Sequence, residues 1–207
     1  MPTQERDYYY TISSTLRAPE LKVLGSRFIA DIVPVSSKEE IESYLSSLGK
    51  EFYDASHHCY AYRLGNLGDL VRAADDGEPS GTAGKPILTV LLGADLTNVL
   101  CVVTRYFGGT KLGTGGLARA YSDAAQLAVK SATRIQILLT KTVTLNCSYE
   151  ELKMIERLLS QYELRSCHSE YGERISMTVD IRLSLIEKFL DELHTKFFGK
   201  VIIEIAR

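Results

Sequence analysis

The last third of the sequence follows an order of strand-like and helix-like segments that few folds can accommodate. From about Lys141 onward, segments with apolar residues at alternate positions, a spacing typical of strands, are interrupted by two segments with helical periodicity. The predicted strands cover residues 140–147, 164–171, 173–183 and 201–206, and the predicted helices cover residues 148–161 and 184–198. The resulting order is strand, helix, strand, strand, helix, strand.

The residues at the helix starts support this order. Each helix begins with a serine that is followed three residues later by a glutamate, Ser148 with Glu151 and Ser184 with Glu187. Such a pair predicts a capping box, in which each side chain accepts a hydrogen bond from the main-chain N–H of the other residue. A βαββαβ order is the split βαβ arrangement of ferredoxin-like domains. We therefore expect a ferredoxin-like domain over residues 137–207.

The sequence before residue 137 predicts a separate domain of mixed strands and helices. Strand patterns cover residues 8–14, 22–33, 56–64 and 98–107, and helix patterns cover residues 36–49, 83–93 and 117–132. Residues 98–107 lack the usual alternation, which predicts a strand that is buried on both faces. The chain is therefore expected to be an α+β protein of two domains, residues 1–136 and 137–207.

The stretch RYFGGTKLGTGGL, residues 105–117, joins that buried strand to a predicted helix. Its five glycines are Gly108, Gly109, Gly113, Gly115 and Gly116. No acidic residue lies between Asp95 and Asp123, whereas Arg105, Lys111 and Arg119 all fall inside this window. The stretch is therefore a basic island in a chain whose formal net charge is −2.

Two interpretations of this glycine stretch are open. A loop that leaves a strand and opens a helix directs several main-chain N–H groups and the helix dipole at one point, which favours an anion such as phosphate. Glycine lets such a backbone adopt positive φ and approach a ligand, while Arg105 and Lys111 would pair with phosphate oxygens. Alternatively, the glycines allow the following helix to pack closely on the sheet. The gathering of basic residues favours the anion site, with Arg119 nearby.

A second polar loop, ADDGEPSGTAGKP, carries three carboxylates within four residues, Asp75, Asp76 and Glu78. Oxygen ligands of this kind suit Mg²⁺, so these residues are candidate metal ligands. The alternative is a solvated turn whose bend is set by the Asp76-Gly77 pair, and this alternative is favoured. We therefore expect no cofactor, with Mg²⁺ as the one candidate.

Other polar residues near these loops are candidates for lining a cleft that they would share with the glycine stretch. Ser80, Thr82 and Lys85 either cap the next helix or face the ligand, and His57 shares one face of a predicted strand with Cys59. Two ligands on one face do not make a zinc site, so His57 is expected to be structural or to line the cleft. The strand tyrosines, among them Tyr60 and Tyr62, are typical of half-buried packing, with base stacking as the alternative.

Composition narrows the cellular setting. The net charge argues against a protein that binds nucleic acid through bulk charge, so any such binding has to be local. Neither a signal peptide nor an apolar run of membrane-spanning length is present, and the four cysteines are scattered without a C-x-x-C pair. We expect a cytoplasmic protein that does not bind membranes.

Two blocks of sequence resemble the signature of the YigZ/IMPACT family: DDGEPSGTAGKPIL (75–88) and VVTRYFGGTKLGTGGLARAY (102–121). The segments HHCYAYRLG and KVLGSRFIA are similar to the same family, so that the resemblance covers essentially the whole chain. It implies a first domain like the second domain of ribosomal protein S5, followed by a ferredoxin-like domain that resembles the last domain of the ribosomal translocase. It also implies that the two blocks lie together, and that the protein regulates translation through nucleic-acid or ribosome binding.

These observations lead to three hypotheses about function. The first is a non-catalytic, translation-associated regulator that binds RNA or ribosome phosphates through the basic glycine stretch. The second is a Mg²⁺-dependent enzyme that acts on a small phosphorylated or nucleotide substrate. The third is an adaptor that binds a protein partner. The sequence favours the first hypothesis and leaves enzymatic activity open.

Overall fold

The computed structural model describes residues 6–205, which fall into two compact units. One unit is Tyr9–Ile137, and the other contains the chain from Leu138 onward together with residues 6–8. The expected first domain began at residue 1, whereas residues 6–8 belong to the second unit. Contacts of Asp7 explain this assignment, because its carbonyl accepts from the Leu139 N–H at 2.7 Å and its carboxylate pairs with Arg182.

A mixed-length antiparallel sheet forms the centre of the first unit. Its strands pair in the order β2, β4, β7, β5, β6, and β3 also pairs with β4. These strands are β2 (Leu16–Arg17), β3 (Leu21–Val23), β4 (Ser26–Pro34), β5 (His57–Leu64), β6 (Leu70–Ala74) and β7 (Val99–Tyr106). A separate two-stranded sheet pairs β1 (Tyr8–Ile12) with β8 (Arg134–Leu138).

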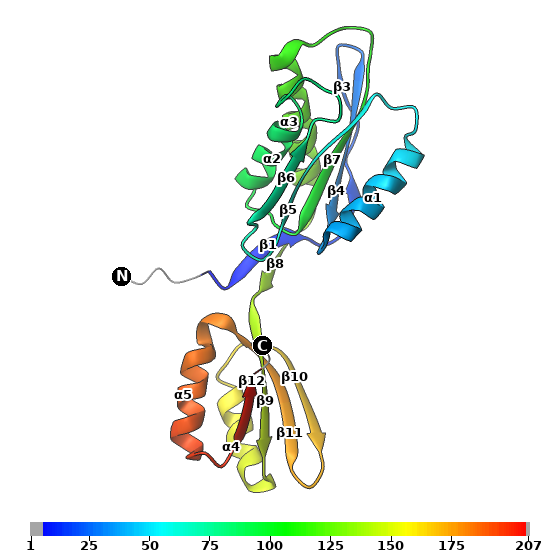
Figure 1. The fold of residues 1–207 in the computed structure, drawn as a ribbon. Coiled ribbons are helices and arrows are strands. Elements are labelled where there is room, and N and C mark those ends of the chain that lie inside the picture. The colour runs from blue at the N-terminus through cyan, green and yellow to red at the C-terminus, as the bar shows by residue number, and fades with distance from the viewer. Residues whose placement is uncertain (1–5, 206–207) are drawn as a thin grey trace, which may run out of the picture. The chain divides into compact units, whose positions relative to one another are not determined.

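Three helices cover the two faces of the large sheet (Figure 1): α1 (Lys38–Glu51), α2 (Gly84–Gly93) and α3 (Gly113–Ser131). One apolar cluster joins α2 and α3 to one face of the sheet, and a second cluster joins α1 to the other face. The middle strand β7 contributes to both clusters, with Val103 in the first and Val102 in the second. The prediction that residues 98–107 form a strand buried on both faces is therefore confirmed.

Several elements differ from the sequence-based expectation. The single strand expected over residues 22–33 is two strands, because the chain turns at Leu24 and Gly25, where φ is +46° and +82°. Helix α3 begins at Gly113, one turn earlier than expected, so that part of the glycine stretch is helical. Strands β6 and β8 were not expected. The burial pattern of β6 explains this miss, because four of its five residues are exposed and carry no apolar alternation.

The second unit has the expected ferredoxin-like order. Its elements are β9 (Thr140–Cys147), α4 (Tyr149–Leu159), β10 (Leu164–Tyr171), β11 (Ile175–Arg182), α5 (Ile186–Phe197) and β12 (Ile202–Ile205). The strands pair antiparallel in the order β10, β11, β9, β12, and apolar residues from one face of this sheet pack with both helices. The expected α+β fold of two domains is confirmed.

The two predicted capping boxes have different outcomes. Ser148 and Glu151 form the expected box at the start of α4. Ser184 does not cap a helix, because it lies in a short 3₁₀ turn (Leu183–Leu185) and its hydroxyl donates to the Asp7 carboxylate. Helix α5 starts two residues later, at Ile186.

Candidate functional site

Arg105 lies at the end of β7 and is buried, with 4% of its surface exposed. Its guanidinium donates to the Glu78 carboxylate and to Ser26 Oγ at 3.3 Å. The ring centroids of Phe28 and Phe107 each lie 5.5 Å from the guanidinium carbon. The expectation that Arg105 offers its charge to a ligand phosphate therefore requires correction, because a carboxylate of the protein already occupies that position.

Glu78 is the centre of a small buried polar network. The Tyr121 hydroxyl of α3 donates to Glu78 Oε1 at 2.8 Å, and His57 Nε2 lies 3.9 Å from the same oxygen. Cys59 is fully buried beside Tyr121, and this burial raises the pKa of its thiol to about 12. Burial likewise raises the pKa of Tyr121 far above its usual range. A thiol held in its neutral form is a poor nucleophile, so we assign this network a structural role. Its contacts hold β5, the acidic loop and α3 together.

The other two carboxylates of the acidic loop are also engaged. Asp75 accepts hydrogen bonds from the main-chain N–H groups of Gly81, Ala83 and Gly84, at 2.8, 3.0 and 2.8 Å. Burial acts to raise the pKa of Asp75, but these N–H groups outweigh it and leave the pKa below its usual range. Asp76 accepts from the His58 N–H at 2.6 Å. Asp75 thus supplies the N-terminal cap of α2, and Asp76 holds the loop against β5.

These contacts weigh against a magnesium site in the acidic loop. Asp75, Asp76 and Glu78 point to three different sets of internal donors, and within residues 6–205 no group of three acidic, histidine or cysteine side chains is arranged to hold a metal ion. Thr82 Oγ1 donates to the Pro79 carbonyl at 2.6 Å and so stabilises the turn. Ser80 and Lys85 are exposed on the loop and at the start of α2.

His57 is held in one orientation by the same loop. Its Nδ1 lies 2.7 Å from the Asp76 carbonyl, which can only accept, so Nδ1 carries the proton in this contact. His57 therefore packs the acidic loop onto β5, in agreement with the structural alternative.

The first half of the glycine stretch is a packing contact. A Cβ placed on Gly108 would lie 1.9 Å from the main-chain carbon of Gly25, so the two backbones cross too closely for any side chain. The N–H groups here are also used internally, because Phe107 donates to Ser56 Oγ at 3.0 Å and Gly108 donates to Ser26 Oγ at 3.1 Å. Packing therefore requires glycine at position 108, but the contact is with the turn between β3 and β4, whereas the sequence-based alternative expected close packing of the following helix on the sheet.

The second half of the stretch is open. A Cβ placed on Gly109, Gly113 or Gly115 would meet no atom within 4 Å, so packing does not require glycine at these positions. Gly109 and Gly113 have φ of +84° and +71°, a conformation that side chains disfavour. Gly116 differs, because a Cβ there would lie 3.1 Å from Leu112 Cβ.

This open half presents main-chain donors at the start of a helix. Helix α3 has no side-chain cap, and its N-cap residue is Leu112. In a helix that begins at Gly113, the N–H groups of the first turn have no acceptor within the helix, whereas the Gly116 N–H reaches back to Leu112. Lys111 and Arg119 are both exposed and form no salt bridge with the residues described. The remaining candidate anion site therefore consists of residues 109–115, Lys111 and Arg119.

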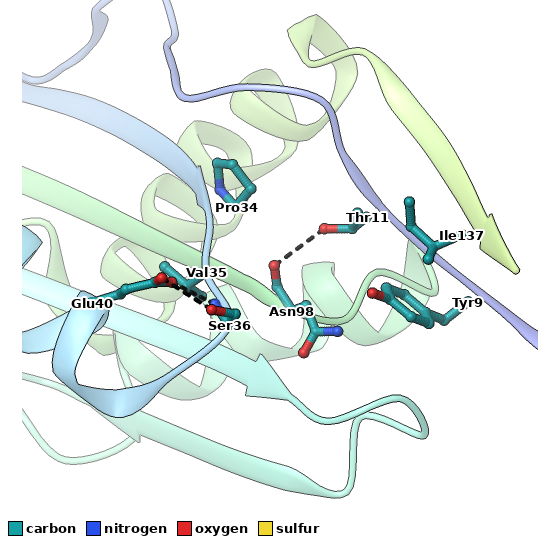
Figure 2. A pocket seen from close by; sticks show the side chains of 8 residues that line it. All are labelled: Tyr9, Thr11, Pro34, Val35, Ser36, Glu40, Asn98 and Ile137. Carbon is teal, nitrogen blue, oxygen red and sulfur yellow. Dashed lines mark hydrogen bonds between the residues drawn. The ribbon is translucent and has the colours of Figure 1, made fainter. Parts of the chain in front are cut away.

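A hollow of about 300 Å³ lies elsewhere on the first unit, and Figure 2 shows its lining. Its polar groups serve the fold: Thr11 Oγ1 donates to the Asn98 carbonyl, and Glu40 accepts from both the N–H and the hydroxyl of Ser36 (Figure 2). The remaining lining includes Pro34, Val35 and Ile137. This hollow has none of the features expected of an anion site.

Sequence reasoning did not identify Ser26, Ser56 or Tyr121, although these residues hold the two loops in place. Their partners lie 43 to 82 residues away in the chain, so no local pattern reveals them. The resemblance did predict that the two sequence blocks lie together, and the pair between Glu78 and Arg105 joins them.

Comparisons with known proteins agree with this architecture. The profile of the Impact N-terminal domain matches residues 24–129, and that of a domain of unknown function (DUF1949) matches residues 145–200. An "IMPACT family member" of Haemophilus influenzae is 33% identical over 95% of this chain and 96% of its own length. "IMPACT family member YvyE" of Bacillus subtilis is 34% identical over 96% of this chain and 87% of its own. A solved structure described as a hypothetical protein is 30% identical, with a TM-score of 0.68 over 98% of both chains.

Proposed function

The chain belongs to the IMPACT family, and from this premise we propose that it is a non-catalytic, translation-associated protein that binds RNA phosphates at the start of α3. The observation that carries the proposal is the uncapped first turn of α3, which is flanked by two exposed cations and by glycines that packing does not require. The free N–H groups and the helix dipole attract an anion, and Lys111 adds a mobile positive charge.

The charge distribution supports a nucleic-acid backbone as the ligand. The protein as a whole carries a net charge of −2, but residues 96–122 contain no acid. A local cationic patch on an otherwise acidic protein can make only a few contacts with phosphates. Each such contact with the RNA backbone releases counterions and raises affinity. The translational setting rests on the family resemblance, and the cytoplasm is the compartment that we expect.

The contacts of the acidic loop argue against a Mg²⁺-dependent enzyme with its metal site there. Its carboxylates are engaged with main-chain donors, Arg105 and Tyr121, so a metal ion would have to displace three separate sets of internal bonds. We therefore do not adopt that alternative.

Replacing Lys111 and Arg119 together by alanine tests the proposal. With a fluorescein-labelled RNA hairpin and fluorescence anisotropy, we expect affinity to fall and the slope of log affinity against log salt to decrease by about one for each lost contact. The matched control is Lys50→Ala with Lys130→Ala, because Lys50 and Lys130 lie in the last turns of α1 and α3.

The control pair is expected to keep the salt slope of the unchanged protein. Equal affinity and equal slope for the Lys111/Arg119 variant would refute the proposal. Equal losses in both pairs would refute it too, because they would show a diffuse electrostatic effect in place of a site.

A further inference from the structure

Strand β6 lies at the end of the sheet in the first unit, next to β5 (Figure 1). Within residues 6–205, no strand pairs with its other side. Leu70 and Val71 of this strand are 42% and 45% exposed, and Leu67 just before it is 76% exposed. An edge strand with free main-chain groups and exposed apolar side chains is a template for pairing, which proteins normally block with charges or a covering loop.

A hollow of about 260 Å³ adjoins this edge on the face that carries α1. Lys38, Ile41, Glu42 and Leu45 line it from α1, Tyr60 and Tyr62 line it from β5, and Arg72 lines it from β6. The four helix residues recur at three- and four-residue spacing, so they lie along one side of α1, with Ile41 and Leu45 packed toward the sheet and Lys38 and Glu42 exposed. Tyr62 lies directly opposite Arg72 in the strand register, and the rings of Tyr60 and Tyr62 are parallel with centroids 6.5 Å apart.

The lining of this hollow carries two positive charges and one negative charge. Lys38 and Arg72 are both exposed and form no salt bridge within the described part of the chain, and Glu42 is the one acidic side chain among the lining residues. The hollow therefore has a net positive charge beside a free strand edge. Its lining also includes the apolar side chains of Ile41 and Leu45.

We propose that β6 accepts an extended, acidic segment of a partner protein as an additional strand, with an acidic side chain of that segment seated beside Arg72. Strand addition draws affinity from main-chain hydrogen bonds and selectivity from pockets for alternate side chains. A residue directly opposite Arg72 in the added strand would have its Cβ about 5 Å from that of Arg72. Its neighbours two residues away would lie on the same face, next to Leu70 and Ala74.

The charge of β6 favours a foreign acidic segment over a second copy of this chain. Antiparallel pairing of two β6 strands about their centres would place Arg72 opposite Arg72, and like charges directly opposite each other are destabilising. This surface is also separate from the proposed RNA site. Arg72, Tyr60 and Tyr62 face α1, whereas α3 packs on the opposite face of the sheet.

Two fluorescein-labelled peptides serve as probes. The first is acetyl-Thr-Val-Thr-Glu-Thr-Val-Thr-amide, in which both valines and the glutamate share one face of a strand, and the second carries lysine in place of glutamate. We expect the intact chain to bind the glutamate peptide more tightly than the lysine peptide, by on the order of tenfold. Hydrogen exchange of the β6 amides should slow when the glutamate peptide is added.

Charge-reversal variants provide the decisive test of the peptide preference. Arg72→Glu should reverse the preference so that the lysine peptide binds more tightly, and Lys38→Glu should weaken the preference for glutamate. Lys50→Glu is the matched control at the other end of α1 and should leave the preference unchanged. An unchanged preference in the Arg72→Glu protein would overturn the proposal, as would peptide binding without slower exchange in β6.

Two further outcomes would also overturn it. If protection of the β6 amides from exchange increases with protein concentration in the absence of peptide, the occupant is a second copy of the chain. Displacement of the glutamate peptide by an RNA hairpin, with hairpin binding lost in Arg72→Glu, would assign the edge to nucleic acid. The Lys111/Arg119 variant separates the two proposals, because it should lose RNA binding and keep peptide binding.

Discussion

The pair between Glu78 and Arg105 shows how one buried residue changes the interpretation of a basic loop. Both side chains are almost inaccessible to solvent: counted over the side-chain atoms alone, 4% of Glu78 and 5% of Arg105 is exposed. Breaking a buried ion pair by removing one charge leaves the other charge uncompensated, which costs about 3 kcal/mol. Glu78→Gln should therefore lower the free energy of unfolding of the first unit by about that amount, as measured by urea unfolding followed through NMR signals of β7.

A matched substitution controls for the loss of a carboxylate. Glu42→Gln removes an exposed glutamate of α1 that forms no salt bridge in the described structure, and it should change stability by less than about 0.5 kcal/mol. Equal stability of the two variants would contradict the structural role assigned to Glu78.

At the scale of single residues, the sequence predicted where the charged side chains lie along the chain better than it predicted whether they are buried or exposed. Arg105 and Lys111 belong to the same glycine stretch and carry the same charge, yet Arg105, at the end of β7, is buried, and Lys111, in the loop that follows, is exposed. The difference depends on Glu78, which lies 27 residues from Arg105 in the chain and reaches it only in the folded sheet. A local pattern contains no information about such a contact. The acidic loop does turn at Asp76 and Gly77, but the expectation of a solvated turn missed the burial of Glu78 and the capping role of Asp75.

The glycine stretch behaves as two elements, and alanine substitutions distinguish them. Gly108→Ala would bring a Cβ to 1.9 Å from the Gly25 backbone, which cannot move as a flexible side chain would. We expect this substitution to destabilise the first unit by about 2 kcal/mol or more in urea unfolding. Gly115→Ala meets nothing within 4 Å and lies in the first turn of α3, so stability should stay the same or rise by up to about 1 kcal/mol.

A large loss of stability in Gly115→Ala would show that the open half of the stretch is a packing contact after all. An unchanged Gly108→Ala protein would show that the crossing with Gly25 is not a constraint.

Helices and strands with clear periodicity were predicted from the sequence, and those specified by distant contacts were not. The ferredoxin-like order follows from apolar spacing and the buried strand β7 from a continuous apolar run, and both patterns reflect burial directly. Strand β6 was not predicted because this exposed edge strand has no apolar alternation. The break between β3 and β4 was not predicted because it depends on Leu24 adopting positive φ, which is uncommon outside glycine. The start of α3 was placed too late because three glycines of the loop are helical.

On the scale of the whole molecule, the second unit is made of two separate segments of the chain, and the first unit lies between them in the sequence. Residues 6–8 belong to the second unit, residues 9–137 form the first, and the chain then returns. The domain boundary expected from the strand and helix patterns fell close to this return, but the sequence has no sign that Asp7 is held by a residue 175 positions later. Such a long-range pair is visible only once the fold is known.

Asp7 gives the last prediction, because its contacts make the stability of the second unit depend on pH. Hydrogen bonds from the Arg182 side chain, with a further one from Ser184, outweigh burial and lower the pKa of Asp7 to about 2. An unfolded aspartate has a pKa of about 3.9, so the folded state favours the charged form. The stabilisation is therefore complete above pH of about 4 and disappears as the pH falls toward 2; it amounts to about 2 kcal/mol.

Asp7→Asn should remove this contribution at neutral pH and leave stability near pH 2 almost unchanged. The stability difference between the two proteins should thus shrink as the pH falls, when urea unfolding is followed through NMR signals of β9 and β11. Signals of β7 should report equal stability of the first unit in both proteins, because Asp7 belongs to the second unit. Asp191→Asn, an exposed aspartate of α5 without a salt bridge in the described structure, is the matched control. A difference that stays constant from pH 7 to pH 2 would show that Asp7 stabilises the unit through packing, and that its charge does not matter.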